Sequence, residues 1–197
     1  MPTLMTVATR VLRLRLVPES APTTSLDDSP AIEFVAYGHE TLLAGWIHLD
    51  ADRLTDLLNA TDELELVDVV CLGPDGRIVD VDCAVIPRSE LVAVKAGDPR
   101  GRPSLRRRTR QTAVAADAGR YLIHGYLHAR PGADPMIDLG RRPPMLPLTD
   151  ATMVYETDDG WQRDEATTLI LNRDTADSVR PARPDELDRL LARRGAA

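Results

Sequence analysis

The sequence predicts a mainly β protein made of two tandem small units, each a five-stranded barrel or sandwich. One short helix is expected in the first unit and another helix at the C-terminal end. Short apolar, β-branched runs are separated by turns that contain glycine, a pattern typical of small antiparallel folds. The same order of runs occurs twice along the chain. Its 197 residues are 43% hydrophobic and 28% charged, which indicates a globular chain of one large or two small domains.

The duplication depends on four landmarks that recur in order. Gly45 in Gly-Trp-Ile-His aligns with Gly125 in Gly-Tyr-Leu-His, and Asp68 aligns with Asp150. Next comes a turn that ends in glycine, Gly76 or Gly160. The last landmark is an arginine with a valine six residues later, Arg88 with Val94 and Arg173 with Val179. Because order and spacing persist, we expect the first unit at 31–97 and the second at 111–182.

The first unit carries the clearest pattern of elements. Residues 33–38 and 40–49 predict one hairpin, 64–72 and 77–88 predict a second, and 90–96 a closing strand. The two-residue alternation in the second hairpin predicts an inward face of Val79, Val81, Cys83 and Val85, with Asp80 and Asp82 toward water.

Between the two hairpins of the first unit, the spacing of Leu54, Leu57 and Leu58 predicts a short helix over 50–60. We expect Asp50 or Asp52 to cap its first turn. The second unit has the proline-rich segment 130–147 at this place, which disfavours a regular helix.

Three flanking segments lie outside the units. Residues 1–30 are interpreted as an N-terminal strand and linker, in which 8–18 would pair with a sheet edge or with a partner. Residues 98–110 form an Arg-rich linker. Residues 183–197 predict a helix whose apolar stripe would dock on the second unit or on another subunit; these candidate partner contacts are Leu187, Leu190 and Leu191.

Charge is concentrated in the linker. The whole chain carries −7, yet residues 95–110 hold seven basic residues against Asp98. Such runs are usually solvated connectors. The alternative is an anion-binding arm for nucleic acid, an acidic protein or lipid head groups, because the guanidinium group suits bidentate phosphate and carboxylate contacts. The candidate anion contacts are Arg100, Arg102, Arg106, Arg107, Arg108 and Arg110.

No motif for catalysis is present. Phosphate-loop, dinucleotide-binding and serine-nucleophile signatures are missing, as is zinc-ligand spacing. We therefore expect no catalytic, cofactor-binding or metal-binding residues. Cys71 and Cys83 are interpreted as reduced thiols, and no run is apolar enough for a membrane span. A cytoplasmic location is expected. A cleft between the units is a further candidate site, lined by Trp46, His48, Tyr126 and His128.

Residues 45–69, GWIHLDADRLTDLLNATDELELVDV, resemble an uncharacterised family of small bacterial β-domains. The match is carried by Arg53, Leu54, Thr55, Asp56, Leu58 and Asn59. The resemblance covers about 32–96 and, in degenerate form, 110–180. It implies a small SH3-like or Sm-like barrel, a fold that hosts many roles.

Together these patterns favour a non-catalytic scaffold, adaptor or accessory subunit of a larger bacterial assembly. Other protein subunits are the expected partners, and self-association through sheet edges is an alternative. Two other functions remain open. One is Sm-like nucleic-acid binding through the Arg-rich linker, which we expect less. The other is sensing of a small molecule or ion at the cleft between the units.

Overall fold

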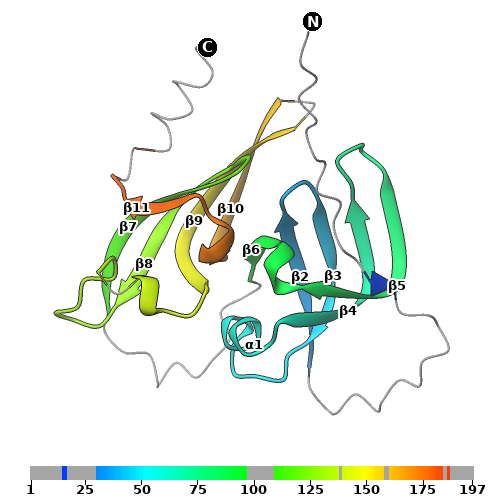
Figure 1. Ribbon diagram of the computed structural model, residues 1–197, viewed down its shortest axis with the longest axis horizontal. Helices are drawn as coiled ribbons and strands as arrows, with labels where there is room; N and C mark the ends of the chain where they lie inside the picture. The colour runs from blue at the N-terminus through cyan, green and yellow to red at the C-terminus, as the bar shows by residue number, and fades with distance from the viewer. Residues whose placement is uncertain are drawn as a thin grey trace, which may run out of the picture.

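The computed structural model describes residues 15–16, 30–96, 109–137, 139–157, 160–183 and 186. Over these residues the chain is mainly β, as predicted. Eleven strands form one antiparallel sheet in the order β1-β5-β4-β3-β2-β6-β10-β9-β8-β7-β11 (Figure 1). Among the described elements, none is a helix long and apolar enough to cross a membrane.

The helices and strands of the two halves occur in the same order. The first half contains β2 (Ala31–Gly38), β3 (Leu42–His48), α1 (Leu54–Ala60), β4 (Glu63–Leu72), β5 (Ile78–Pro87), η1 (Arg88–Glu90) and β6 (Leu91–Lys95). The second half contains β7 (Arg110–Ala118), β8 (Tyr121–Ala129), η3 (Leu139–Arg141), β9 (Met145–Thr157), β10 (Gly160–Asn172), η4 (Arg173–Thr175) and β11 (Ser178–Pro181). A 3-10 turn, η3, thus replaces the helix α1 in the second half.

Strand register is also the same in the two halves. Phe34 lies opposite Gly45 as Val114 lies opposite Gly125, and Cys71 lies opposite Val79 as Met153 lies opposite Asp164. Ala36 lies opposite Val94 as Ala116 lies opposite Val179. Gly45 and Gly125, like Val94 and Val179, therefore occupy equivalent places in the sheet, and the shared register assigns counterparts to the paired strand residues of the two halves.

A bulge at the same point of each half explains two of the landmarks. The register between β3 and β4 shifts at Gly45, and that between β8 and β9 shifts at Gly125. Asp68 and Asp150 lie in the left-handed region, with φ of 50° and 46°. Aspartate tolerates this conformation better than most residues. A Cβ on Gly45 would lie 3.0 Å from the carbonyl oxygen of Val67, so the close approach of the backbones requires glycine.

The bulge also reverses the face that β4 turns to the core. Leu64 and Leu66 are buried before Asp68, whereas Val69 and Cys71 are buried after it. Since β5 stays in one register with β4, its faces change at the same level.

The inward face predicted for residues 79–85 holds at Val81, which packs against the core cluster while Asp80 and Asp82 are exposed. It is wrong at Cys83 and Val85. Ala84 and Ile86 are fully buried, while Val79 is 53% exposed. A two-residue alternation assumes a regular strand throughout, and the bulge breaks that assumption.

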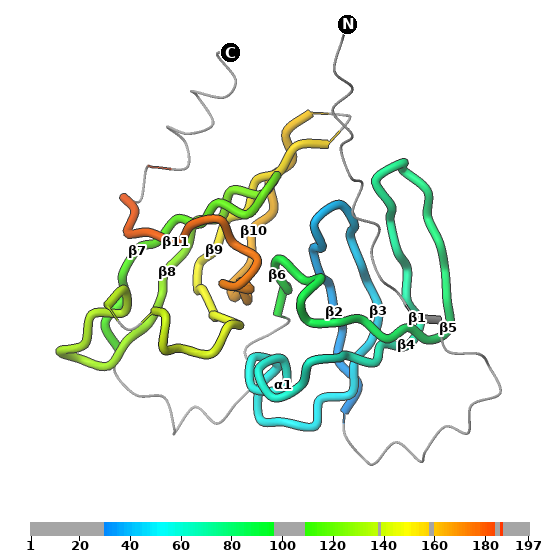
Figure 2. Tube along the Cα trace, viewed as in Figure 1, coloured from blue at the N-terminus to red at the C-terminus, as the bar shows by residue number. Residues whose placement is uncertain are grey.

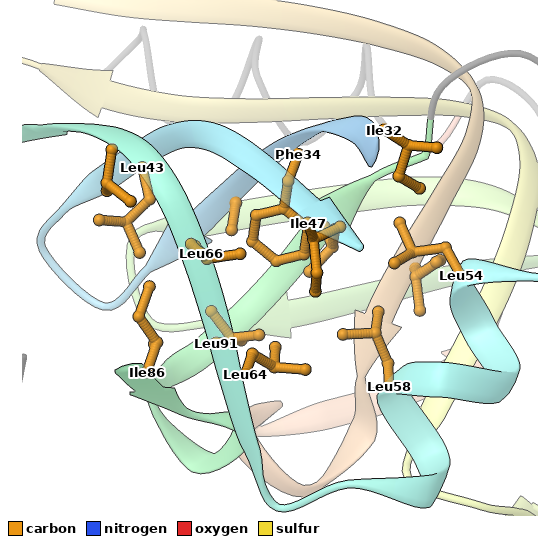
Figure 3. Packing of buried hydrophobic residues seen from close by; sticks show 14 of the residues in the cluster. Ile32, Phe34, Leu43, Ile47, Leu54, Leu58, Leu64, Leu66, Ile86 and Leu91 are labelled. Carbon is orange, nitrogen blue, oxygen red and sulfur yellow. The ribbon is translucent and has the colours of Figure 1, made fainter. Parts of the chain in front are cut away.

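The first hydrophobic core lies between the bent strands and α1 (Figure 3). Phe34, fully buried, and Ile47 project from β2 and β3 toward Leu64 and Leu66 of β4. Leu54 and Leu58 of α1 cover one end of this cluster, as their spacing predicts. The capping prediction is wrong: α1 begins after Arg53 and no side chain caps its first turn.

The flanking segments are described only in part. Arg15–Leu16 forms β1, which pairs antiparallel with β5 at the edge of the sheet. Of the linker at 98–110, only Thr109 and Arg110 are described. The predicted C-terminal helix, with Leu187, Leu190 and Leu191, lies outside the described residues except for Arg183 and Glu186.

Candidate functional site

The two halves are joined edge to edge by β6 and β10. Lys95 lies opposite Leu169, Val94 opposite Ile170 and Ala93 opposite Leu171. In Figure 2 the β6 trace lies between the traces of the two halves. Val94 and Ile170 are both fully buried, so the junction is part of the protein interior. The cores also interlock, because residues of each half belong to the core cluster of the other.

Three tyrosines pack together beside this junction, and two of them bond to one carboxylate. The hydroxyl of Tyr37 on β2 donates to Asp164 Oδ2 on β10 at 2.7 Å, and that of Tyr155 on β9 donates to the same oxygen at 3.2 Å. The rings of Tyr37 and Tyr121 meet edge to face with centroids 6.0 Å apart. Tyr121 also donates to the carbonyl oxygen of Gly38 at 2.7 Å. We call Tyr37, Tyr121, Tyr155 and Asp164 the tyrosine cluster.

Burial and the neighbouring carboxylate keep these hydroxyls protonated. Burial is the main cause that raises the pKa of Tyr37, and its hydrogen bond to Asp164 raises it further. Burial and then the negative charge of Asp164 raise the pKa of Tyr155 to about 12. The cluster therefore supplies neutral hydrogen-bond donors near neutral pH, and it is suited to holding the halves together rather than to proton abstraction.

Arg120 lies at the rim of the tyrosine cluster. Its guanidinium carbon is 5.1 Å from the ring centroid of Tyr121 and 5.8 Å from that of Tyr155, within the range of cation–π attraction. Its Nε is buried without a hydrogen-bond partner, as are His39 Nε2 and Thr41 Oγ1 in the adjacent turn between β2 and β3. The scarcity of aromatic residues was the only sequence signal for this cluster. Its members lie far apart along the chain, so their spacing does not predict that they meet.

The tyrosine cluster predicts a loss of stability at alkaline pH. Unfolded tyrosine titrates near pH 10, and the folded pKa of Tyr155 is about 12. Since the folded state retains a proton that the unfolded state releases, the stabilisation is complete below pH 10 and is lost as pH rises toward 12. Urea denaturation from pH 9 to pH 12 is expected to show a weaker decline for Tyr155→Phe than for the natural chain. Tyr126→Phe, outside the cluster, is expected to follow the natural chain. Parallel declines in all three would contradict the prediction.

Two asparagines tie the halves together beyond the junction. Asn59 at the end of α1 donates to the carbonyl oxygen of Met145 on β9 at 3.0 Å and accepts from the Met145 N–H at 3.0 Å. Asn172, 2% exposed, donates to the carbonyl oxygens of Arg88 and Leu91 at 3.1 and 2.9 Å. The bonds of Asn59 give that residue a structural role.

The paired arginine landmarks are structural anchors. Arg88 donates to the carbonyl oxygens of Leu58 and Thr61 at the end of α1, at 3.2 and 3.1 Å, and to Asp62 at 2.7 Å. Arg173 donates to the carbonyl oxygens of Leu139 and Arg142 around η3, both at 2.7 Å. Each arginine thus satisfies backbone carbonyls of the segment that links the two hairpins of its half.

The four residues predicted to line a cleft lie on strands that are not neighbours. Trp46 and His48 are on β3, Tyr126 and His128 on β8, and the sheet order places β2, β6, β10 and β9 between them. Trp46 is 45% exposed. Both ring nitrogens of His128 are hydrogen-bonded, Nδ1 to Thr109 at 2.7 Å and Nε2 to Thr149 at 2.8 Å.

The remaining candidates from the sequence are metal ligands, the two cysteine thiols and the arginine set. Across the described ranges, no three His, Cys, Asp or Glu side chains gather where they could hold a metal ion. Cys71 and Cys83 are free, and burial raises the pKa of both thiols. Arg110, exposed at the start of β7, is the one member of the arginine set inside the described residues.

The outer edge of β11 carries backbone groups that point away from β7. The N–H of Ala182 donates to the carbonyl oxygen of Ala113 on β7. Because paired and unpaired positions alternate along antiparallel strands, Val179, three residues earlier and opposite Ala116, turns its N–H and C=O away from β7. No strand covers this edge among the described residues.

Comparison of the chain with family models, curated proteins and solved structures finds no match.

Proposed function

We propose that the protein is a non-catalytic scaffold or accessory subunit, built of two tandem small barrel units, that binds other proteins through its sheet edges. The observation that carries this proposal is the junction itself. The two halves associate by antiparallel pairing of β6 with β10, and the edge of β11, the counterpart of β6, carries no further strand in the described part of the sheet. A sheet edge with outward N–H and C=O groups is a ready template for a partner strand.

The character of the buried polar groups agrees with this role. The tyrosine cluster, the two bridging asparagines and the two arginine anchors are each committed to hydrogen bonds within the fold. The tyrosine cluster and the two asparagines hold the halves in one arrangement, which fixes the sheet edges relative to each other. The arginine anchors brace each half internally. Preorganised edges lower the cost of ordering on association.

The proposal is tested by affinity capture from a lysate of the natural host, with the tagged full-length chain as bait. The bait is compared with Val179→Pro, which removes the outward N–H of β11 without removing a bond to β7. Val179→Ala is the matched control, because it keeps that N–H. We expect a defined set of host proteins to bind the natural chain and Val179→Ala, and to be depleted about tenfold with Val179→Pro. Equal recovery by all three baits, or no recovery by any, would contradict edge binding.

A further inference from the structure

The short strand β1 takes the same place on β5 that β6 takes on β10. Arg15 lies opposite Val85 and Leu16 opposite Ala84. At the internal junction, Val94 lies opposite Ile170 and Lys95 opposite Leu169. The shared register makes Val85 and Ala84 the counterparts of Ile170 and Leu169. Both added strands are antiparallel, so β1 imitates the fifth strand of a neighbouring half.

Backbone directions agree at the two places. The N–H of Ala96 donates to the carbonyl oxygen of Thr168, which by alternation makes Val94 and Ile170 a hydrogen-bonded pair. The N–H of Arg88 donates to the carbonyl oxygen of Asp62, so Val85, three residues earlier, faces away from β4. Val85 thus presents the same outward groups toward β1 that Ile170 presents toward β6.

The counterpart of β6 in the second half is β11, and the counterpart of β10 in the first half is β5. Val179 stands where Val94 stands, and its N–H and C=O point outward. The two outer edges of the sheet, β11 and β5, could therefore pair with each other in the way that β6 pairs with β10. One of these edges is covered by the two residues of β1, and the described residues place no strand on the other.

We propose that β11 of one copy pairs antiparallel with β5 of a second copy, with Val179 opposite Val85 and Arg180 opposite Ala84. In the isolated chain β1 occupies this edge of β5, and it must leave before the second copy can bind. The inference rests on the proposed function, because it names a second copy as the partner of the edge. The contact joins unlike surfaces, so each added copy leaves one edge of each kind available.

The residues around the proposed contact fit reversible association. Beyond the reach of β1, Ile78 and Val79 on β5 are 65% and 53% exposed, which leaves apolar surface beside the edge. The hydrogen bond between Tyr37 and Asp164 at the internal junction has no equivalent between copies. The counterpart of Tyr37 is Asp117, and the counterpart of Asp164 is Val79. The contact between copies lacks that hydrogen bond, and we expect it to be weaker than the internal junction.

The test measures self-association of the purified full-length chain by sedimentation equilibrium. Arg15→Pro removes the N–H that pairs with Val85 and frees the edge of β5, so the dissociation constant is expected to fall roughly tenfold. Leu16→Pro is the matched control, because the N–H of Leu16 points away from β5, and it is expected to resemble the natural chain. Adding Val179→Pro to Arg15→Pro is expected to return the chain to a monomer.

Disulfide crosslinking tests the register itself. In a Cys83→Ser background, Ala84→Cys with Arg180→Cys is expected to form bonds between chains under mild oxidation, because these positions would be directly opposed. Moving one cysteine four residues, to Asp80→Cys with Arg180→Cys, is expected to abolish the product. Lys95→Cys with Leu169→Cys occupies the equivalent internal positions and is the control, which is expected to close within one chain.

The outcomes separate the two proposals. If the internal control closes but Ala84→Cys with Arg180→Cys gives no bond between chains, even with Arg15→Pro, the self-association proposal is overturned. Host proteins captured in a Val179-dependent way would then still support edge binding to other partners. Crosslinking in the stated register, without capture of any protein other than the chain itself, would support self-association and overturn a role in binding other subunits.

Discussion

Replacing Asn172 by leucine is expected to lower the free energy of unfolding by about 2–3 kcal/mol. The Asn172 side chain is 2% exposed and bonds to the carbonyl oxygens of Arg88 and Leu91, and its Oδ1 accepts the N–H of Asp174. Leucine has a similar volume, so the loss arises from unpaired polar groups rather than from a cavity. Urea denaturation monitored by tryptophan fluorescence measures the change.

Two further variants sharpen this prediction. Asn172→Asp keeps the acceptor for Asp174 but places a carboxylate beside two carbonyl oxygens, so it is expected to destabilise more at pH 7 than at pH 4. Gln162→Leu, an equally apolar change at an exposed position of the same strand, is expected to stay within about 0.5 kcal/mol of the natural chain. A loss no larger for Asn172→Leu than for Gln162→Leu would contradict a structural bridge between the halves.

Substituting either bulge glycine by alanine is expected to cost about 1–3 kcal/mol. A Cβ on Gly45 would lie 3.0 Å from the carbonyl oxygen of Val67, and one on Gly125 would lie 3.1 Å from the Cβ of Leu148. A Cβ on Gly125 would also lie 3.3 Å from the carbonyl oxygen of Thr149. The backbone must therefore move at both positions, and we expect losses of similar size. Denaturation curves of the two single variants and of the double variant measure these effects.

Gly140→Ala is the matched control for the bulge glycines, because no atom lies within 4 Å of its added Cβ. It is expected to be neutral or slightly stabilising. Asp68→Val tests the other side of the bulge, since a β-branched residue is strongly disfavoured at a φ of 50°. If Gly45→Ala and Gly140→Ala were equally stable, the close approach of β3 and β4 would not constrain this position.

The sequence was informative wherever a local pattern had a local cause. The spacing of Leu54 and Leu58 predicts α1, and both side chains are buried. The landmarks Gly45 and Gly125 could be aligned because each is required by a close backbone approach. Arg88 and Arg173 could be aligned because each supplies donors to the carbonyls of a preceding segment.

Predictions failed where the cause lay on another strand. The valine alternation placed Cys83 and Val85 on the inward face, whereas Ala84 and Ile86 are buried there, because a left-handed Asp68 on the neighbouring strand reverses the pleat. The cap predicted from Asp50 or Asp52 is missing, and Arg88, 27 residues or more from the carbonyls it contacts, secures the other end of α1 instead. The tyrosine cluster joins Tyr37 to Asp164, 127 residues apart, a separation over which spacing carries no signal.

By itself, the sequence determined that the protein is mainly β, that its pattern occurs twice, and where α1 and most strands lie. These features follow from short-range patterns of burial and backbone preference, which act within a few residues. Only the tertiary structure decided that the halves join β6 to β10, that Asp164 gathers two tyrosine hydroxyls, and that β1 covers the edge of β5. Pairing of strand edges uses backbone groups that every residue possesses, so side-chain identity alone does not select which edges meet.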